Sequence, residues 1–329
     1  MELKTEIKQL RRKFVKDFQF PIQVVQEPYF HQRLNYLEEE EGAKTKYINL
    51  TGMVTDDFGG SASKFMEYGH SLTDRIIADI INSDAYKQDF LRLLPTKEEI
   101  DQHAKLIEGK IINGKKLYTI EQDGGMFVSF DMKKANFQLI RYICPAVLHD
   151  AKTYQEYISK FTEYDYFKES KGLRQTIFGK VNPKEVSKAE LIIASEFFLW
   201  MHGQIGVKYF PYSINNDEVI FKFNGTKEEF LNDKLVGGDD IEYKGVNFRC
   251  TKFILHARVF DMATSDQKIV VFEKEDILRG HRRTLACCPA TYYPQVYKAL
   301  RGLEIEDTDL VFYYEHELCK FMNPIKLIK

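Results

Sequence analysis

The sequence predicts an α+β protein with an antiparallel, ferredoxin-like sheet in βαββαβ order, helical insertions and a mostly helical N-terminal lobe. Apolar residues follow helical spacing through most of residues 1–110, whereas short apolar runs bounded by turn residues alternate with helical segments after residue 111. The chain of 329 residues is 44% hydrophobic, which is enough to bury a substantial core. These patterns favour an antiparallel sheet with helices on one face.

The first lobe is expected to be helical. Residues 3–18 carry apolar side chains every three or four positions with Lys and Arg on the other face, which predicts an amphipathic helix docked on the core. Helical spacing returns over residues 71–94 and 97–108. The acidic run Glu38 to Glu41 is expected to be a solvated loop or the end of a helix.

The expected strands begin at residue 111, where Ile111-Ile112 and Leu117 to Ile120 flank an Asn113-Gly114 turn signal. The next strand, Met126 to Phe130, ends in Asp131. We expect the later elements in this order: helices over 134–142, 154–167, 171–180 and 182–203, strands over 207–214 and 219–223, a helix from Thr226 to Leu235 that ends at Gly237-Gly238, and strands over 241–243 and 246–255. Asn182 and Thr226 are the predicted N-caps of their helices.

The composition argues against several classes of protein but leaves room for a local basic groove. The formal net charge is −2, so the chain is not globally basic in the way of strong nonspecific nucleic-acid binders. No apolar run approaches the roughly 18 residues that span a membrane, and no targeting signal opens the chain. The five cysteines are odd in number and lack Cys-x-x-Cys spacing. We therefore expect a cytoplasmic protein with reduced thiols and no membrane contact.

Acidic residues interrupt two runs that otherwise predict buried strands. Asp131 ends the first strand, and Asp217-Glu218 directly precedes Val-Ile-Phe. In βαββαβ topology the end of the first strand lies beside the hairpin turn. Asp131 and Asp217 are therefore expected to hold two Mg²⁺ ions for phosphoryl transfer, with Glu218 as a third acid near the primer end. The alternative is that Asp131 is a helix N-cap and that Asn215-Asn216-Asp217 is only a turn.

Three segments resemble motifs of family A DNA polymerases, in the order of that family. Asp131-Met-Lys-Lys-Ala-Asn-Phe-Gln is similar to the first carboxylate motif, Arg174-Gln-Thr-Ile-Phe-Gly to the fingers-helix motif, and Asn216-Asp217-Glu218 to the His-Asp-Glu signature. The resemblance implies a small template-directed DNA polymerase in which Asp131 and Asp217 bind the metal ions.

The resemblance also implies roles for residues beyond the carboxylates. Arg174 takes the place of the cation that holds the incoming triphosphate, with Lys171 on the same short helix. Phe178 takes the place of the aromatic residue beside the nucleotide and is followed by Gly179. Asn136 stands where most members carry the glutamate that excludes the ribose 2′-hydroxyl, so the use of ribonucleotides stays open.

On this resemblance the chain divides into polymerase-like parts. They are a thumb-like lobe over 1–110, a palm over 111–145 and 205–262, a fingers-like insertion over 146–204 and a C-terminal extension over 263–329. The implied partners are a primer–template and nucleoside triphosphates, and a protein partner is also open.

Other families share parts of these motifs. Asp131-Met-Lys-Lys-Ala also resembles a reverse-transcriptase motif, and Tyr212 to Glu218 resembles a strand of tRNAHis guanylyltransferase-like polymerases and cyclic-dinucleotide synthases. Gly237-Gly-Asp-Asp240 is similar to the Gly-Asp-Asp of RNA-dependent RNA polymerases, although its position favours a helix stop. A non-catalytic relative that binds nucleic acid or a polymerase is a further alternative.

A compact basic cluster lies in the C-terminal part of the chain. It consists of Arg279, His281, Arg282 and Arg283. Such a cluster is suited to contacting the phosphates of a nucleic acid. The alternative is an ordinary solvated face.

Overall fold

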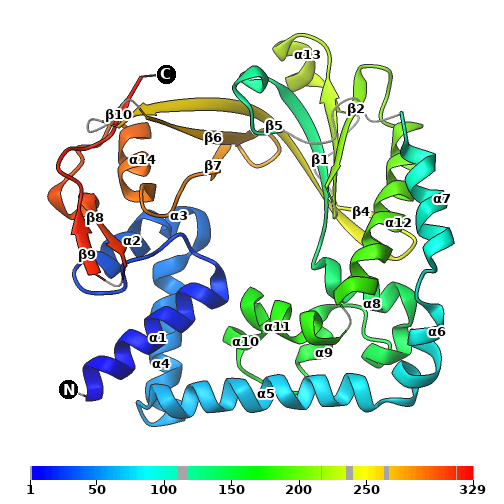
Figure 1. The fold of residues 1–329 in the computed structure, drawn as a ribbon, viewed down its shortest axis with the longest axis horizontal. Helices are drawn as coiled ribbons and strands as arrows, with labels where there is room; N and C mark the ends of the chain where they lie inside the picture. The colour runs from blue at the N-terminus through cyan, green and yellow to red at the C-terminus, as the bar shows by residue number, and fades with distance from the viewer. Residues whose placement is uncertain are drawn as a thin grey trace.

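The elements of the chain are arranged around an open centre (Figure 1). The computed structural model describes residues 2–109, 117–181, 183–215, 217–234, 240–262, 267–315 and 317–328. Helices and an antiparallel sheet are combined in the described part, which confirms the predicted α+β class.

The N-terminal part is helical, as predicted. Its helices are α1 (Glu2–Phe18), α2 (Tyr29–Tyr36), α3 (Glu38–Glu41), α4 (Ala43–Phe58), α5 (Ala62–Asn82), a π-helical turn (Ala85–Phe90), α6 (Leu91–Leu93) and α7 (Lys97–Ile107). The single helix expected over 71–94 is therefore divided into three pieces. Phe14 of α1 is fully buried against Phe20 and Tyr47. A capping box formed by Thr96 and Glu99 begins α7.

The main sheet has the strand order β2-β3-β1-β5-β6-β7, with β4 and β10 also paired to β5. Its strands are β1 (Met126–Met132), β2 (Tyr209–Asn215), β3 (Glu218–Phe223), β4 (Ile241–Tyr243), β5 (Val246–Asp261), β6 (Lys268–Asp276), β7 (Arg282–Ala286) and β10 (Lys326–Leu327). Every pairing in it is antiparallel. A separate hairpin is formed by β8 (Val311–Tyr314) and β9 (Glu317–Lys320).

Helices are inserted between the strands. They are α8 (Ala135–Ile143), α9 (Tyr154–Ile158), α10 (Asp165–Glu169), α11 (Lys171–Val181), α12 (Pro183–His202) and α13 (Lys227–Asn232). Of these, α8 and α12 pack against the sheet, whereas α11 packs against α5. The Phe197 ring of α12 lies 5.4 Å from that of Phe130 on β1 and 3.9 Å from that of Phe248 on β5. Because side chains alternate along a strand, Asp131 points to the face of the sheet opposite to Phe130.

Several local predictions differ from the structure. Residues 117–120 form no strand, because Leu117 and Tyr118 pack against the apolar face of the sheet instead. The helix expected over 154–167 is broken into α9 and α10, where the Thr162 hydroxyl accepts a hydrogen bond from the Tyr164 amide. The helix capped by Thr226 ends at Asn232. The predicted features at Asn113-Gly114, Asn182, Asn216 and Gly237-Gly238 lie outside the described residues.

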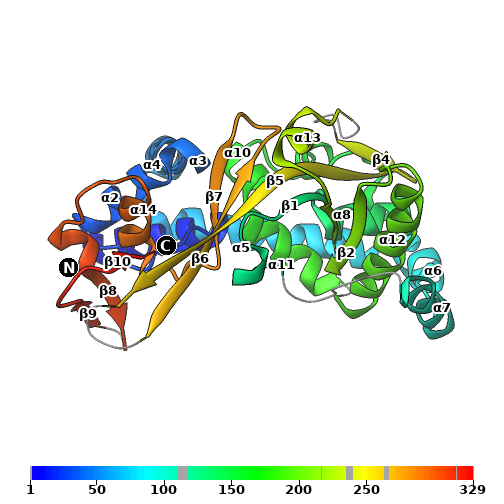
Figure 2. The same cartoon turned by 90° about the horizontal axis from the view of Figure 1, so that it is seen from above.

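The C-terminal segment returns to the N-terminal helices through α14 (Tyr293–Leu300) and a 3₁₀ turn (Asp307–Leu310). Arg33 of α2 donates hydrogen bonds to the carbonyl oxygens of Thr308 at 3.0 Å and Val311 at 3.1 Å. These contacts close the elements into a ring. From above, β5 and β6 run between the end that holds α2, α4 and α14 and the end that holds α7 and α12 (Figure 2). Within the described residues, we find no helix with the length and apolarity of a membrane span.

Candidate functional site

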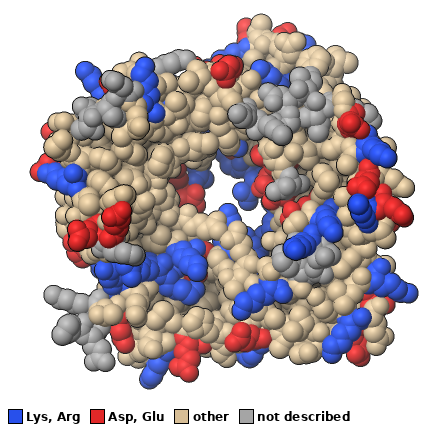
Figure 3. Space-filling view, in the orientation of Figure 1, with Lys and Arg blue, Asp and Glu red and all other residues tan. Residues whose placement is uncertain are grey.

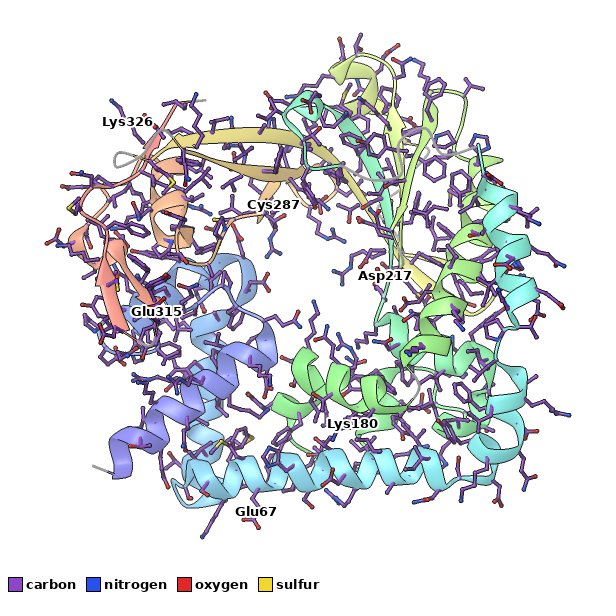
Figure 4. The ribbon with its side chains drawn as sticks, viewed as in Figure 1. Glu67, Lys180, Asp217, Cys287, Glu315 and Lys326 are labelled. Atoms are coloured by element: carbon purple, nitrogen blue, oxygen red, sulfur yellow. The ribbon has the colours of Figure 1, made fainter. Side chains whose placement is uncertain are left out.

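The acids predicted to act together are brought together by the sheet. Asp131 on β1 lies opposite Glu218 on β3 in the antiparallel register. The Met132 amide donates a hydrogen bond to the Asp217 carbonyl oxygen at 2.8 Å, which fixes the hairpin end beside the end of β1. Asp217 lies at the edge of the open centre (Figure 4). Asp131 and the Asp217-Glu218 pair, which are distant in sequence, thus converge at one end of the sheet.

The electrostatic state of Asp131 reflects this convergence. Burial, followed by repulsion from Asp217 and Glu218, raises the pKa of Asp131 to about 6. Arg249 and Lys274 act in the opposite direction and favour the ionised carboxylate. Asp131 is thus an acid in a field of like charge, only partly balanced by neighbouring cations.

A fourth acid, Glu190, lies beside this group. Burial, with a contribution from Asp217, raises the pKa of Glu190 to about 7. Glu190 belongs to α12, and it stands between Ala189 and Leu191 in an otherwise apolar stretch of the helix. Glu190 was not among the predicted site residues, although a carboxylate in an apolar stretch is the same pattern that pointed to Asp131.

A pocket of about 510 Å³ opens beside Asp131 and Asp217. Its cations are contributed by the start of α8, by α11 and by β5, and they are Lys133, Lys134, Lys171, Arg174 and Arg249. Asn136 and Glu190 also line it. The pocket therefore joins the predicted carboxylates to the predicted nucleotide-binding residues Asn136, Lys171 and Arg174.

The cations of this pocket repel one another. Burial, followed by repulsion from Arg174, Lys133 and Arg249, lowers the pKa of Lys134 to about 8. Burial also lowers the pKa of Arg174 below its usual value. The Lys134 Nζ and the Arg174 Cζ each lie 5.5 Å from the centre of the Tyr154 ring. A polyanion bound here would relieve this repulsion, so the pocket is suited to phosphate groups.

Two predicted nucleotide contacts do not reach the pocket. Phe178 is only 2% exposed and packs against Phe137 and Tyr154, with ring centres 6.1 Å from each. Its expected position beside a nucleotide is therefore wrong, because on α11 the pocket receives Lys171 and Arg174 while Phe178 faces the core. Gly179 is exposed but is not part of the pocket wall.

A second pocket of about 510 Å³ lies between the sheet and α3. It shares Asp131 and Arg249 with the first pocket and also contains Glu218 and Lys274. The Lys274 Nζ lies 3.8 Å from a Glu218 carboxylate oxygen. Burial alone would lower the pKa of Lys274, but Glu218 and Tyr118 raise it above its usual value. Lys274 is therefore a stable cation beside the acids, and no local sequence pattern predicts it.

The predicted basic cluster lines a third pocket of about 490 Å³. Arg279, His281, Arg282 and Arg283 all contribute to its wall. Arg279 pairs with Asp276 at 2.5 Å, and His281 lies 2.7 Å from Glu275. Arg279 and Arg282 also belong to the second pocket. The cluster is therefore continuous with the carboxylate site.

The donor set of the carboxylate site fits a hard cation. Among the described residues, no group of three or more His, Cys, Asp or Glu side chains is arranged to hold a metal ion. Mg²⁺ does not require such a group, because it keeps several waters and is commonly bound by one or two carboxylates together with substrate phosphates. Asp131 and Asp217 supply two carboxylates beside a pocket suited to phosphates.

Comparisons with family models, curated proteins and solved structures gave no match to this chain. The resemblance to family A DNA polymerases therefore stays an expectation from the sequence motifs.

Proposed function

We propose that this chain is an Mg²⁺-dependent nucleotidyltransferase, of the template-directed DNA polymerase type. The observation that carries the proposal is the pocket in which Asp131 and Asp217 face a cluster of Lys and Arg side chains. The strand order supports it, because β2-β3-β1-β5 with helices after β1 and β3 is the order of a split βαββαβ palm.

The residues of the pocket suit the two halves of such a reaction. Asp131 and Asp217 would hold the divalent ions, which supply charge neutralisation at the attacking and leaving oxygens when bound. Lys134, Lys171 and Arg174 would pair with the oxygens of the triphosphate. Asn136, on the same wall, would contact the nucleotide through its side-chain amide.

Nucleotide incorporation tests this proposal directly. Purified protein is mixed with Mg²⁺, labelled deoxyribonucleotides or ribonucleotides, and a primer, with or without a template. The variants Asp131→Asn and Asp217→Asn are expected to lose about 10²- to 10³-fold in rate, since metal-bound charge stabilisation is worth several kcal/mol. Asp101→Asn, an exposed position on α7, is the matched control. Equal incorporation by all four proteins would reject the proposal.

A second candidate function is a non-catalytic nucleic-acid-binding protein. It is favoured by Lys274 and Arg249, which already place positive charge beside Glu218 and Asp131. In that case nucleic acid binds tightly while Mg²⁺ leaves the stability of the protein unchanged. Incorporation that does not depend on template would instead favour a tRNAHis guanylyltransferase-like reaction, and incorporation on an RNA template a reverse-transcriptase-like one.

A further inference from the structure

The ring is closed by a buried set of contacts between α2 and the C-terminal segment. Asp309 is fully buried, and it accepts hydrogen bonds from the Tyr36 hydroxyl at 2.6 Å and from Lys298 Nζ at 2.9 Å. Arg33 is 3% exposed and is held by two backbone carbonyls of the same segment. Opening the ring here would break the hydrogen bonds of Arg33 and Tyr36 to the C-terminal segment and expose this buried contact to water, which favours the closed form.

A second contact closes the ring on the side of α3. Arg282 of β7 donates a hydrogen bond to the Glu40 carbonyl oxygen, and Arg301 pairs with the Glu40 carboxylate at 3.2 Å. The sequence separations of these contacts are 242 and 261 residues, so they join opposite ends of the chain. The closure is therefore made by two independent groups of contacts.

The three pockets form one continuous inner wall. The first and second share Asp131 and Arg249, and the second and third share Glu40, Arg279 and Arg282. The second pocket is lined both by α3 and by β1 and β3, so it reaches across the space between the N-terminal helices and the sheet. The space-filling view shows the open centre with both basic and acidic side chains at its edge (Figure 3).

The walls of the three pockets carry charges of both signs, with ten Lys or Arg side chains and nine Asp or Glu side chains. Several of these cations already pair with carboxylates, as Arg279 does with Asp276 and Arg301 with Glu40. Within the described residues, Lys134, Lys171, Arg174, Arg249 and Arg283 make no ion pair, so these five are the cations of the wall that suit a phosphate backbone. Among the described residues, the walls of these three pockets contain no aromatic side chain on which bases could stack. Contacts would therefore be made to phosphates, without reading the base sequence.

We infer that the inner wall binds one single strand of nucleic acid, which passes through the closed ring and enters by its end. The class of partner rests on the proposed function, whereas the threaded path rests on the ring and its wall. Each pocket has about 500 Å³, the size of a small-ligand site, which suits the nucleotides of one strand rather than a duplex. The strand end would reach Asp131 and Asp217 along this path.

The test is a trapping experiment with the full chain, without Mg²⁺ or nucleotides so that no incorporation occurs. Single-stranded DNA and RNA oligonucleotides of the same sequence carry biotin at both ends, and streptavidin caps the ends either before or after the protein is added. Capping before mixing is expected to weaken binding at least tenfold. Capping after mixing is expected to lengthen the half-life of the complex at high salt at least tenfold. The DNA and RNA arms identify which strand is bound.

Binding that is unaffected by capping first, or release at high salt at the same rate with and without caps, would overturn the threaded path. Two charge-reversal variants add a second measurement. Arg283→Glu on the inner wall is expected to weaken binding at least tenfold. Arg92→Glu, on α6 with a side chain 76% exposed, should change it less than twofold. Equal effects would also count against the inner wall.

The outcome is separable from that of the proposed function. Trapping without nucleotide incorporation would support the threaded path and reject the nucleotidyltransferase activity. Incorporation without trapping would support the activity and reject the threaded path.

Discussion

Replacing Asp131 by Asn is expected to stabilise the folded protein at neutral pH while removing the proposed nucleotidyltransferase activity. Burial and the neighbouring acids raise the pKa of Asp131 from its ordinary value of 3.8 to about 6. At about 1.36 kcal/mol per pKa unit, ionisation of this carboxylate costs up to about 3 kcal/mol of folding stability. Because the side chain is only half-buried, screening by solvent reduces this to about 2 kcal/mol.

The sign of the pH dependence follows from the direction of the shift. The folded protein holds this proton more tightly than the unfolded chain, so stability is lost as the pH rises from about 4 to about 6 and stays lost above that. Asp131→Asn removes the ionisation. The variant should therefore be about 2 kcal/mol more stable than the natural protein at pH 8 and equally stable below pH 4.

Urea unfolding at pH 8 and at pH 3.5 measures the difference, with Asp101→Asn as an exposed control. Millimolar Mg²⁺ should stabilise the natural protein at pH 8 and have little effect on Asp131→Asn, because a ligand stabilises only the state that binds it. A variant that is no more stable than the natural protein at pH 8 would show that Asp131 is not held in a field of like charge.

Three further predictions concern neighbouring residues. Burial and Asp217 raise the pKa of Glu190 to about 7, so the Glu190 side chain loses its proton between pH 6 and 8. Mg²⁺ affinity should therefore rise over this pH range in the natural protein and rise less in Glu190→Gln. Identical pH profiles of the two proteins in magnesium titrations would argue against an effect of Glu190 on Mg²⁺ binding. Lys134→Met should raise the KM for nucleotide by about 10- to 100-fold, since a charge-assisted hydrogen bond is worth about 1.5–3 kcal/mol. The control Lys87→Met, at an exposed position, should leave KM unchanged. Phe178→Ala should lower the free energy of unfolding by about 3–5 kcal/mol without altering nucleotide selectivity, because the Phe178 ring is buried. Unchanged stability together with altered selectivity would show that Phe178 contacts the nucleotide after all.

That Asp131 and Asp217 lie close together could be predicted from the sequence, because the prediction needs only local patterns and one rule of sheet topology. Asp131 and Asp217 each interrupt an apolar strand, and the βαββαβ order puts the end of the first strand beside the hairpin. The Thr226 cap was likewise predictable, since a capping box is a signal within four residues.

The cations that complete the site were not predictable in the same way. Arg249 faces Asp131 only because of the register between β1 and β5, and Lys274 reaches Glu218 from a strand that is not its neighbour. Register depends on packing across the whole sheet rather than on any local signal. Phe178 was misplaced for a related reason: a motif identifies a helix but not the face that the core will cover.

The charges of the first pocket favour a site for substrate over a structural ion-pair network. The pocket wall carries five cations against three carboxylates, and in the part of the chain that the structure describes Lys133 is the one of these cations that pairs with an acid outside the wall, Asp240. A network that served only stability would pair its charges, because unpaired half-buried charges cost free energy. Here repulsion persists on both sides: the pKa of Lys134 is lowered by its cationic neighbours and that of Asp131 is raised by its acidic ones. A triphosphate with bound Mg²⁺ carries charges of both signs and would relieve both repulsions at once, as neither a simple anion nor a metal ion alone would.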